Sequence, residues 1–182
     1  MNRTAIRPTG VERTFGPDEL IVSKTDLRGR ITYANDVFMR VSRYEEHELI
    51  GMPHNIVRHP DTPRALFGYV WKTVQSGEEV FAYIPNLASD GAHYWVLAHI
   101  TPSTDGHGEV VGYHSNRRVP SARAVAEAQS FYADVLAAER AQDDPVTSID
   151  AGTETFNRKL GAQGMTYDEW FWDLTTRSTQ AG

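Results

Sequence analysis

The sequence predicts an α+β fold in which a five-stranded antiparallel sheet carries helices on one face. Two stretches rich in β-forming residues come first, helical patterns follow, and three longer β-rich stretches come next. Turn-forming residues separate the last three stretches, at residues 89–91 and 105–108. Because such short turns join neighbouring antiparallel strands, a single sheet with helices inserted after its first hairpin is the simplest arrangement.

Composition sets the limits on function. The chain has 182 residues, a net charge of −6 and 40% hydrophobic residues, which fits one globular domain with appended segments. An acidic chain without a clustered basic face argues against nucleic-acid binding. The absence of cysteine excludes disulfides, thiolate zinc sites, cysteine nucleophiles and flavin–cysteinyl photochemistry. No signal peptide and no run of ~18 apolar residues is found, so we expect a cytoplasmic protein that makes no membrane contact.

The first third of the chain reads as an arm, a hairpin and short helices. Residues 1–19 contain several Gly and Pro residues and predict an arm, with a short helix around residues 11–15. Residues 20–34 form two β-rich runs around a glycine turn, which predicts a hairpin. Asn35 is placed to cap a following helix, and a polar helical turn over residues 44–49 stops at Gly-Met-Pro.

The densest group of polar side chains follows at residues 54–61, which read His-Asn-Ile-Val-Arg-His-Pro-Asp. After it, residues 62–75 predict a helix with apolar residues on one side, closed by Gly77. The three later strands are expected at residues 80–87, 93–101 and 110–117.

The C-terminal part predicts two more helices. Residues 121–142 carry a narrow apolar stripe at helical spacing, and residues 143–155 have the Asp, Pro, Ser and Gly content of a linker. A terminal helix is marked by a capping box formed by Thr166 and Glu169. The expected organisation is therefore an arm, an α+β domain, a C-terminal helix, and a linker with a short terminal helix, at residues 1–19, 20–119, 120–142 and 143–182.

Five stretches together resemble the PAS sensor domain of bacterial aerotaxis receptors. They are Thr-Asp at residues 25–26, Ile-Thr-Tyr-Ala-Asn-Asp-Val-Phe at 31–38, Glu-Leu-Ile-Gly-Met-Pro-His-Asn-Ile-Val-Arg-His-Pro-Asp at 48–61, Trp71, and His-Tyr-Trp-Val at 93–96. The resemblance covers residues 20–118 and implies the PAS fold, non-covalently bound FAD, and a redox state that reports oxygen or respiratory status. One departure is Asn-Leu-Ala-Ser-Asp-Gly-Ala at residues 86–92, where the family often has basic residues.

Carried over residue by residue, the resemblance implies six cofactor-binding residues: Arg58, His59, Asp61, Trp71, Asn35 and Asn86. An arginine suits a phosphate, an asparagine suits the pyrimidine edge of a flavin, and an indole offers a flat face for stacking. Plain structural roles remain open for these residues. Arg58 and Asp61 could pair with each other at a helix start, Trp71 could be core, and Asn35 could be only a helix cap.

Haem b is the alternative cofactor, although the helix expected at residues 62–75 contains no histidine. His54, His59, His93, His99 and His114 remain possible ligands. We predict no metal site and no catalytic residues, since the histidines lack ligand spacing and no nucleophile motif is found. A cofactor-free PAS interaction module is the third reading.

Partners are expected on the basis of the same resemblance. PAS domains commonly dimerise, so a homodimer through the flanking helices is expected. The family's membrane anchor and signalling module have no counterpart in these 182 residues. The signal would therefore pass in trans to a chemotaxis or other signalling protein.

Overall fold

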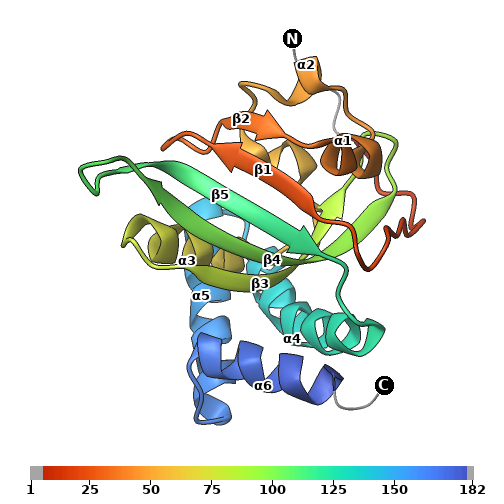
Figure 1. The fold of residues 1–182 in the computed structure, drawn as a ribbon. Coiled ribbons are helices and arrows are strands. Elements are labelled where there is room, and N and C mark those ends of the chain that lie inside the picture. The colour runs from red at the N-terminus through yellow and green to blue at the C-terminus, as the bar shows by residue number, and fades with distance from the viewer. Residues whose placement is uncertain (1–5, 180–182) are drawn as a thin grey trace.

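A five-stranded antiparallel sheet forms the centre of the computed structural model, which describes residues 6–179 (Figure 1). Its strands lie in the order β2-β1-β5-β4-β3. The strands are β1 (Ile21–Thr25), β2 (Ile31–Ala34), β3 (Val80–Leu87), β4 (His93–Thr104) and β5 (Val110–Arg118). The first hairpin thus joins the last strand in the middle of the sheet, and the predicted fold class is confirmed.

Three short helices and one longer helix connect β2 to β3 and cover the inner face of the sheet (Figure 1). They are α1 (Asp36–Ser42), α2 (Glu46–Leu49), the 3-10 helix η1 (His54–Val57) and α3 (Arg64–Gln75). Helix α3 packs on β3 and β4 through buried Leu66, Val70 and Val74. The residue that follows η1, Arg58, pairs with the edge strand β3 through an antiparallel bridge to Asn86. The polar segment at residues 54–61 is thereby held along the sheet edge.

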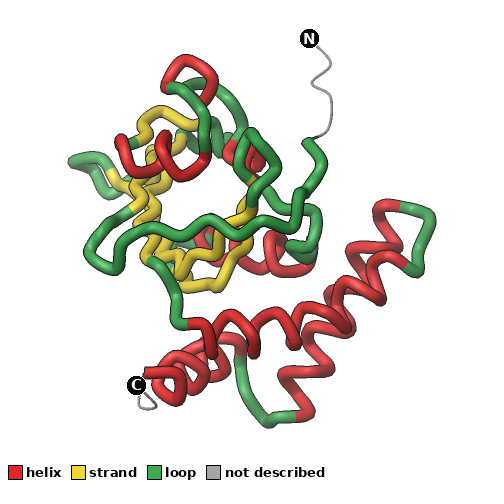
Figure 2. The backbone as a smooth tube through the Cα atoms, turned by 90° about the vertical axis from the view of Figure 1, so that its right-hand side faces the viewer, coloured by secondary structure: helices red, strands yellow, loops and turns green. Residues whose placement is uncertain are grey.

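The C-terminal helices form a unit that extends beyond the sheet and the helices that cover its inner face (Figure 2). They are α4 (Ala122–Arg140), α5 (Pro145–Ala162) and α6 (Tyr167–Thr179). Helices α4 and α6 pack on β3, where Phe171 of α6 stacks on Phe81 at 5.6 Å and the Tyr132 hydroxyl donates to the Tyr83 carbonyl. Phe81 and Tyr83 alternate with the inward-facing residues of β3, so this unit covers part of the outer face of the sheet.

Helix α5 corrects the prediction of a linker over residues 143–155. Asp144 caps the helix by accepting hydrogen bonds from the N–H groups of Val146 and Thr147, and Pro145 suits its first turn. The Ser and Gly residues that suggested a linker are packing positions, because Ser148 and Gly152 face α4. The capping box of α6 is confirmed, since the Glu169 carboxylate accepts from the Thr166 N–H at 2.7 Å.

The N-terminal arm differs from the predicted short helix at residues 11–15. From residue 6 onward it is extended and runs along the start of β4, where Val11 and Arg13 exchange backbone hydrogen bonds with His93. Phe15 is buried while Val11 is exposed, so the spacing of these two residues did not mark a helical face. Residues 1–5 of the predicted arm lie outside the described residues. No helix among residues 6–179 is long and apolar enough to cross a membrane.

Candidate functional site

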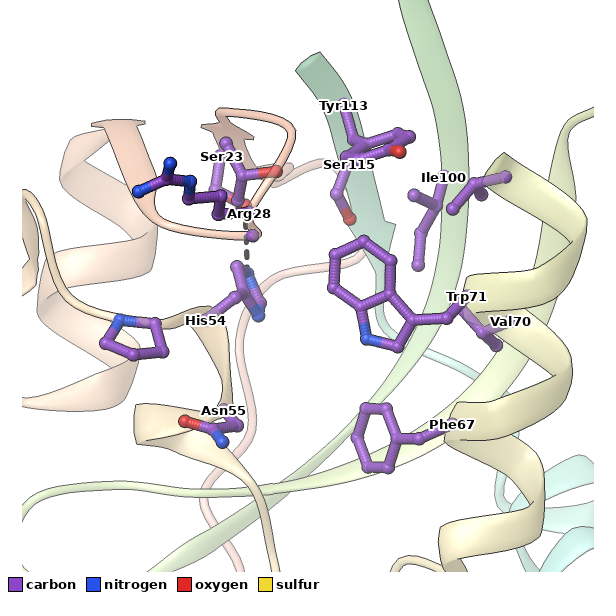
Figure 3. A pocket seen from close by; sticks show the side chains of 14 residues that line it. Ser23, Arg28, His54, Asn55, Phe67, Val70, Trp71, Ile100, Tyr113 and Ser115 are labelled. Atoms are coloured by element: carbon purple, nitrogen blue, oxygen red, sulfur yellow. Dashed lines mark hydrogen bonds between the residues drawn. The ribbon is translucent and has the colours of Figure 1, made fainter. Parts of the chain in front are cut away.

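A cavity lies between α3, η1 and the inner face of the sheet (Figure 3). It has a volume of about 320 Å³ and is lined mainly by apolar and aromatic side chains. Those from α3 and the sheet are Phe67, Val70, Trp71, Val74, Ile100 and Tyr113. Figure 3 shows Trp71 and Phe67 projecting from α3 toward His54 and Asn55 of η1. An apolar slot with a few polar groups at its borders is the usual form of a small-molecule site.

A smaller space of about 50 Å³ adjoins this cavity and shares His54, Asn55, Phe67, Ile100 and Ser115 with its lining. We call this space the inner end of the cavity. Its remaining lining comprises the apolar Ile84, Val96 and Ala98 and the polar Arg58, Asn86 and Arg117. The cavity therefore changes along its length from aromatic walls to a polar, positively charged end.

Arg117 is the main charge at the inner end. Its side chain is only 2% exposed, and its Nε donates to the Ser115 hydroxyl at 3.0 Å. One terminal nitrogen, Nη2, contacts the Ser23 hydroxyl and His54, while the other, Nη1, has no hydrogen-bond partner. Within residues 6–179 Arg117 forms no ion pair, and burial lowers its pKa to about 10. A buried cation without a counter-charge is costly unless something else compensates it.

His54 is held neutral beside this cation. Burial, and then the charge of Arg117, lower the pKa of His54 to about 3. Because a guanidinium only donates, the 3.1 Å contact makes the His54 Nε2 an acceptor and leaves the proton on Nδ1. The ring also stacks on Phe38 at 5.9 Å, and the Arg117 guanidinium lies 4.7 Å from the centre of the same Phe38 ring. These contacts fix His54 and Arg117 as one unit.

Trp71 forms the wall of the cavity on α3. Its indole meets Tyr113 edge-on at 5.4 Å, and its tip packs against the β1–β2 turn at Gly29. A Cβ at Gly29 would lie 2.8 Å from the indole, and the φ of +71° there also favours glycine. A side chain at position 29 would therefore strain the backbone and also collide with the indole of Trp71.

Arg58 and Asn86 both border the inner end. The Arg58 guanidinium lies 4.6 Å from the centre of the Phe67 ring and donates to the Thr62 carbonyl at 2.9 Å. Burial lowers its pKa, whereas the carboxylate of Glu139 acts in the opposite direction. On its other side Arg58 borders an open hollow that also contains Arg64. Of the six residues predicted from sequence, Arg58, Asn86 and Trp71 are therefore brought to the cavity.

The other three predicted residues lie outside the cavity lining. The Asn35 side chain accepts from the N–H groups of Val22 and Phe38, so it caps α1 as its position suggested. His59 Nδ1 accepts from the Asp61 N–H at 3.1 Å, and burial lowers the pKa of His59. Asp61 forms an ion pair with Arg140 of α4 at 2.5 Å. A direct contact of these three residues with a cofactor stays a prediction.

Sequence reasoning missed Arg117 and Ser115, which line the inner end, and Ser23, whose hydroxyl contacts Arg117. A signal was present, because Tyr113, Ser115 and Arg117 alternate along β5 and so share one face of the strand. An arginine on the inward face of a central strand is unusual unless it has a polar task.

The fold and this cavity point to a class of sensor domains. The chain belongs to the PAS family, since the family model described as PAS fold matches residues 21–115. All of α3 and β5 up to Ser115 lie inside the matched region, whereas Arg117 at the inner end and helices α4, α5 and α6 lie outside it.

Two curated relatives and one solved structure illustrate the relationship. The aerotaxis receptor of Escherichia coli (strain K12) is 41% identical over 115 residues, which cover 63% of this chain and 22% of the receptor. The nitrogen fixation regulatory protein of Klebsiella pneumoniae is 32% identical over 97 residues, covering 53% of this chain and 20% of that protein. The chain therefore spans only about a fifth of these relatives.

The solved structure is the light state of the blue-light photoreceptor Aureochrome1 LOV. It superposes with a TM-score of 0.56 at 18% identity, over 60% of this chain and 88% of that chain. At this identity the likeness concerns the fold.

Proposed function

We propose that this chain is a PAS redox sensor that binds FAD non-covalently in the cavity between α3 and the sheet. The observation that carries the proposal is the buried, unpaired Arg117 at the inner end of an otherwise aromatic slot. A buried charge without a counter-charge lowers the stability of the fold, and an electron-rich ring edge would compensate its lost hydration. The similarity to the aerotaxis receptor supports the same class of function.

The residues present fit the three parts of FAD. Phe67, Val70 and Trp71 would enclose a flat ring system, and the Asn86 amide could hydrogen-bond its pyrimidine edge. Arg117 would place its free Nη1–H groups at the same edge. Positive charge for the diphosphate is available outside the inner end, at Arg28 on the border of the cavity and at Arg64 in the adjoining hollow.

When bound, a flavin supplies reversible redox chemistry, while the protein contributes binding and electrostatics. Arg117 stays charged at neutral pH and would favour any added negative charge at the ring edge. His54 stays neutral and would hold Arg117 in place without adding a second positive charge. We propose a sensing role without catalysis, with homodimers and a separate signalling partner as the output.

Haem is less well supported than FAD. The histidine that lines the cavity is His54, and its Nε2 already accepts from Arg117, so ligation would break that contact. In a cofactor-free interaction module, nothing would compensate the buried charge of Arg117.

The visible absorption spectrum of the purified protein tests the proposal. We expect two broad bands, in the near-ultraviolet and the blue, after purification or after incubation with FAD. A single intense Soret band would establish haem instead. A featureless spectrum after incubation with both cofactors would leave the interaction module.

Arg58 can then be assigned with a matched pair of variants. Arg58→Ala removes the guanidinium beside Phe67, and Arg118→Ala makes the same change at an exposed position of β5 that borders a hollow on the outer face of the sheet. Because Arg58 lies at the inner end, Arg58→Ala should lower the affinity for FAD and for riboflavin to the same extent. Loss of FAD affinity alone would assign Arg58 to the diphosphate, and unchanged affinity for both would remove it from the site.

A further inference from the structure

The N terminus of α3 is capped by a residue of the C-terminal helices. The first N–H groups of a helix have no partner within the helix, and Pro63 at the cap position offers no side-chain hydrogen bond. Glu139 of α4 supplies acceptors for the first two of them. Its Oε2 accepts from the Arg64 N–H at 3.0 Å, and its Oε1 accepts from the Ala65 N–H at 2.9 Å. A carboxylate is also the charge that a helix N terminus favours.

Glu139 is enclosed by α5. Its side chain is buried, and the Ser148 hydroxyl of α5 donates to its main-chain carbonyl at 2.9 Å. Gly152, one turn further along α5, lies directly over the carboxylate, because a Cβ there would come within 2.5 Å of Oε1. Helix α5 therefore closes on the carboxylate only where a glycine leaves room.

The helix that Glu139 caps is also the wall of the cavity. Phe67 and Trp71 lie one and two turns after Arg64, and both line the cavity. Next to the cap, Arg58 donates to the Thr62 carbonyl and packs on Phe67. A displacement of α3 by a bound ring would thus reach the two N–H groups held by Glu139 through one rigid element. A second contact, between Arg140 and Asp61, joins the same ends.

We propose that Glu139 is a positioning residue that couples occupancy of the cavity to the docking of α4 and α5. The proposal rests on the proposed function for the identity of the ligand, FAD. It assigns the transmission of the signal to the contact between the N terminus of α3 and Glu139, and Glu139 lies outside the matched PAS region. Coupling of this kind is reciprocal, so disturbing the contact must also change FAD affinity.

Two pairs of variants in the full chain test the coupling. Glu139→Gln removes the charge and one acceptor, whereas Glu127→Gln makes the same change elsewhere on α4, where the partners are Arg123 and Arg177. Gly152→Ala forces a methyl group against Glu139. Gly161→Ala adds the same methyl group to α5, where nothing lies within 4 Å. Because alanine favours helix, weaker binding by Gly152→Ala cannot come from a weakened α5.

The measurements are the dissociation constant for FAD, from a fluorescence titration, and hydrogen exchange of peptides from α3, α4 and α5 with and without FAD. In the wild-type protein, FAD should slow exchange in α4 and α5 as well as in α3. Glu139→Gln and Gly152→Ala should weaken FAD binding by about fivefold or more. Both should also abolish the FAD-dependent change in α4 and α5. Glu127→Gln and Gly161→Ala should behave as wild type.

The coupling is overturned if Glu139→Gln and Gly152→Ala bind FAD as their controls do and keep the exchange response. It is also overturned if wild-type protein binds FAD without any change in α4 and α5, a result that leaves the proposed function standing. Failure of the wild-type protein to bind FAD would overturn both proposals.

Discussion

Replacing Arg117 with methionine separates a cofactor role of this residue from a structural one. The lowering of the Arg117 pKa from its ordinary value to about 10 in the fold corresponds to about 3 kcal/mol. Since the pKa is lowered in the folded state, this cost is fully present at every pH below about 10 and disappears as the pH rises above it. At pH 7 the wild-type protein therefore carries all of it.

The substitution also removes contacts that stabilise the fold. Arg117 interacts with Ser115, Ser23 and His54, and each such hydrogen bond contributes about 1 kcal/mol net. The two effects are similar in size and opposite in sign. The free energy of unfolding of cofactor-free Arg117→Met should therefore stay within about 1 kcal/mol of the wild type, although a buried charged side chain is lost. FAD affinity should fall by about tenfold or more, because a charge-assisted hydrogen bond to the ring is lost.

Urea unfolding of the cofactor-free protein and a FAD titration measure the two quantities. A loss of stability of about 3–5 kcal/mol, as when a buried pair is broken, together with unchanged FAD affinity would refute the reasoning. Arg117 would then be a structural residue that the fold needs for itself.

Three further substitutions, one of them with a matched control, test other residues predicted or observed near the cavity. Gly29→Ala should lower the free energy of unfolding by about 1–2 kcal/mol, because the backbone there is left-handed. It should also weaken FAD binding, because the added methyl group displaces Trp71. Gly51→Ala shares the backbone cost without a neighbour within 4 Å, so equal FAD affinity in the two variants would contradict this role of Trp71. The wild-type protein should lose up to about 1.4 kcal/mol of stability per pH unit as the pH falls below 6.5. In this range His54 is protonated in the unfolded chain but stays neutral in the folded protein, where its pKa is about 3. In urea unfolding, His54→Gln should lack this part of the pH dependence, and an identical pH profile would place His54 in solvent. Asn35→Ala should lose about 1–2 kcal/mol of stability as a helix cap yet bind FAD normally in a titration, whereas weaker binding would return this residue to the site.

The sheet and α3 could be predicted from sequence because their signals are local. Alternation along the strands, turn residues between them and Gly77 after α3 each act within a few residues. Helix α5 could not be predicted in this way. Its Ser148 and Gly152 oppose helix by propensity, and only their contacts with α4 explain them.

The candidate site was predictable only in part, for a related reason. The polar segment at residues 54–61 stands out in the sequence, yet it divides in space. Arg58 faces the inner end of the cavity, whereas His59 and Asp61 face hollows at the surface and α4. Arg117 lies near the end of β5, and sequence reasoning did not assign it to the site. What makes it notable is the absence of a carboxylate near it among residues 6–179, which only the folded structure reveals.

The same argument applies to the N terminus of α3. Pro63 fixes the backbone for a helix start but cannot cap it, so the local sequence offers no acceptor to the first N–H groups of α3. Glu139 lies 75 residues beyond Arg64 and accepts from the N–H groups of Arg64 and Ala65, at a place where a glycine, Gly152, leaves room for α5 to close. The wall of the cavity is thus completed by a segment outside the matched PAS region. A PAS core that contained its own cap would have no need of this contact, which is why the dependence of α3 on Glu139 argues for a link between ligand binding and the C-terminal helices.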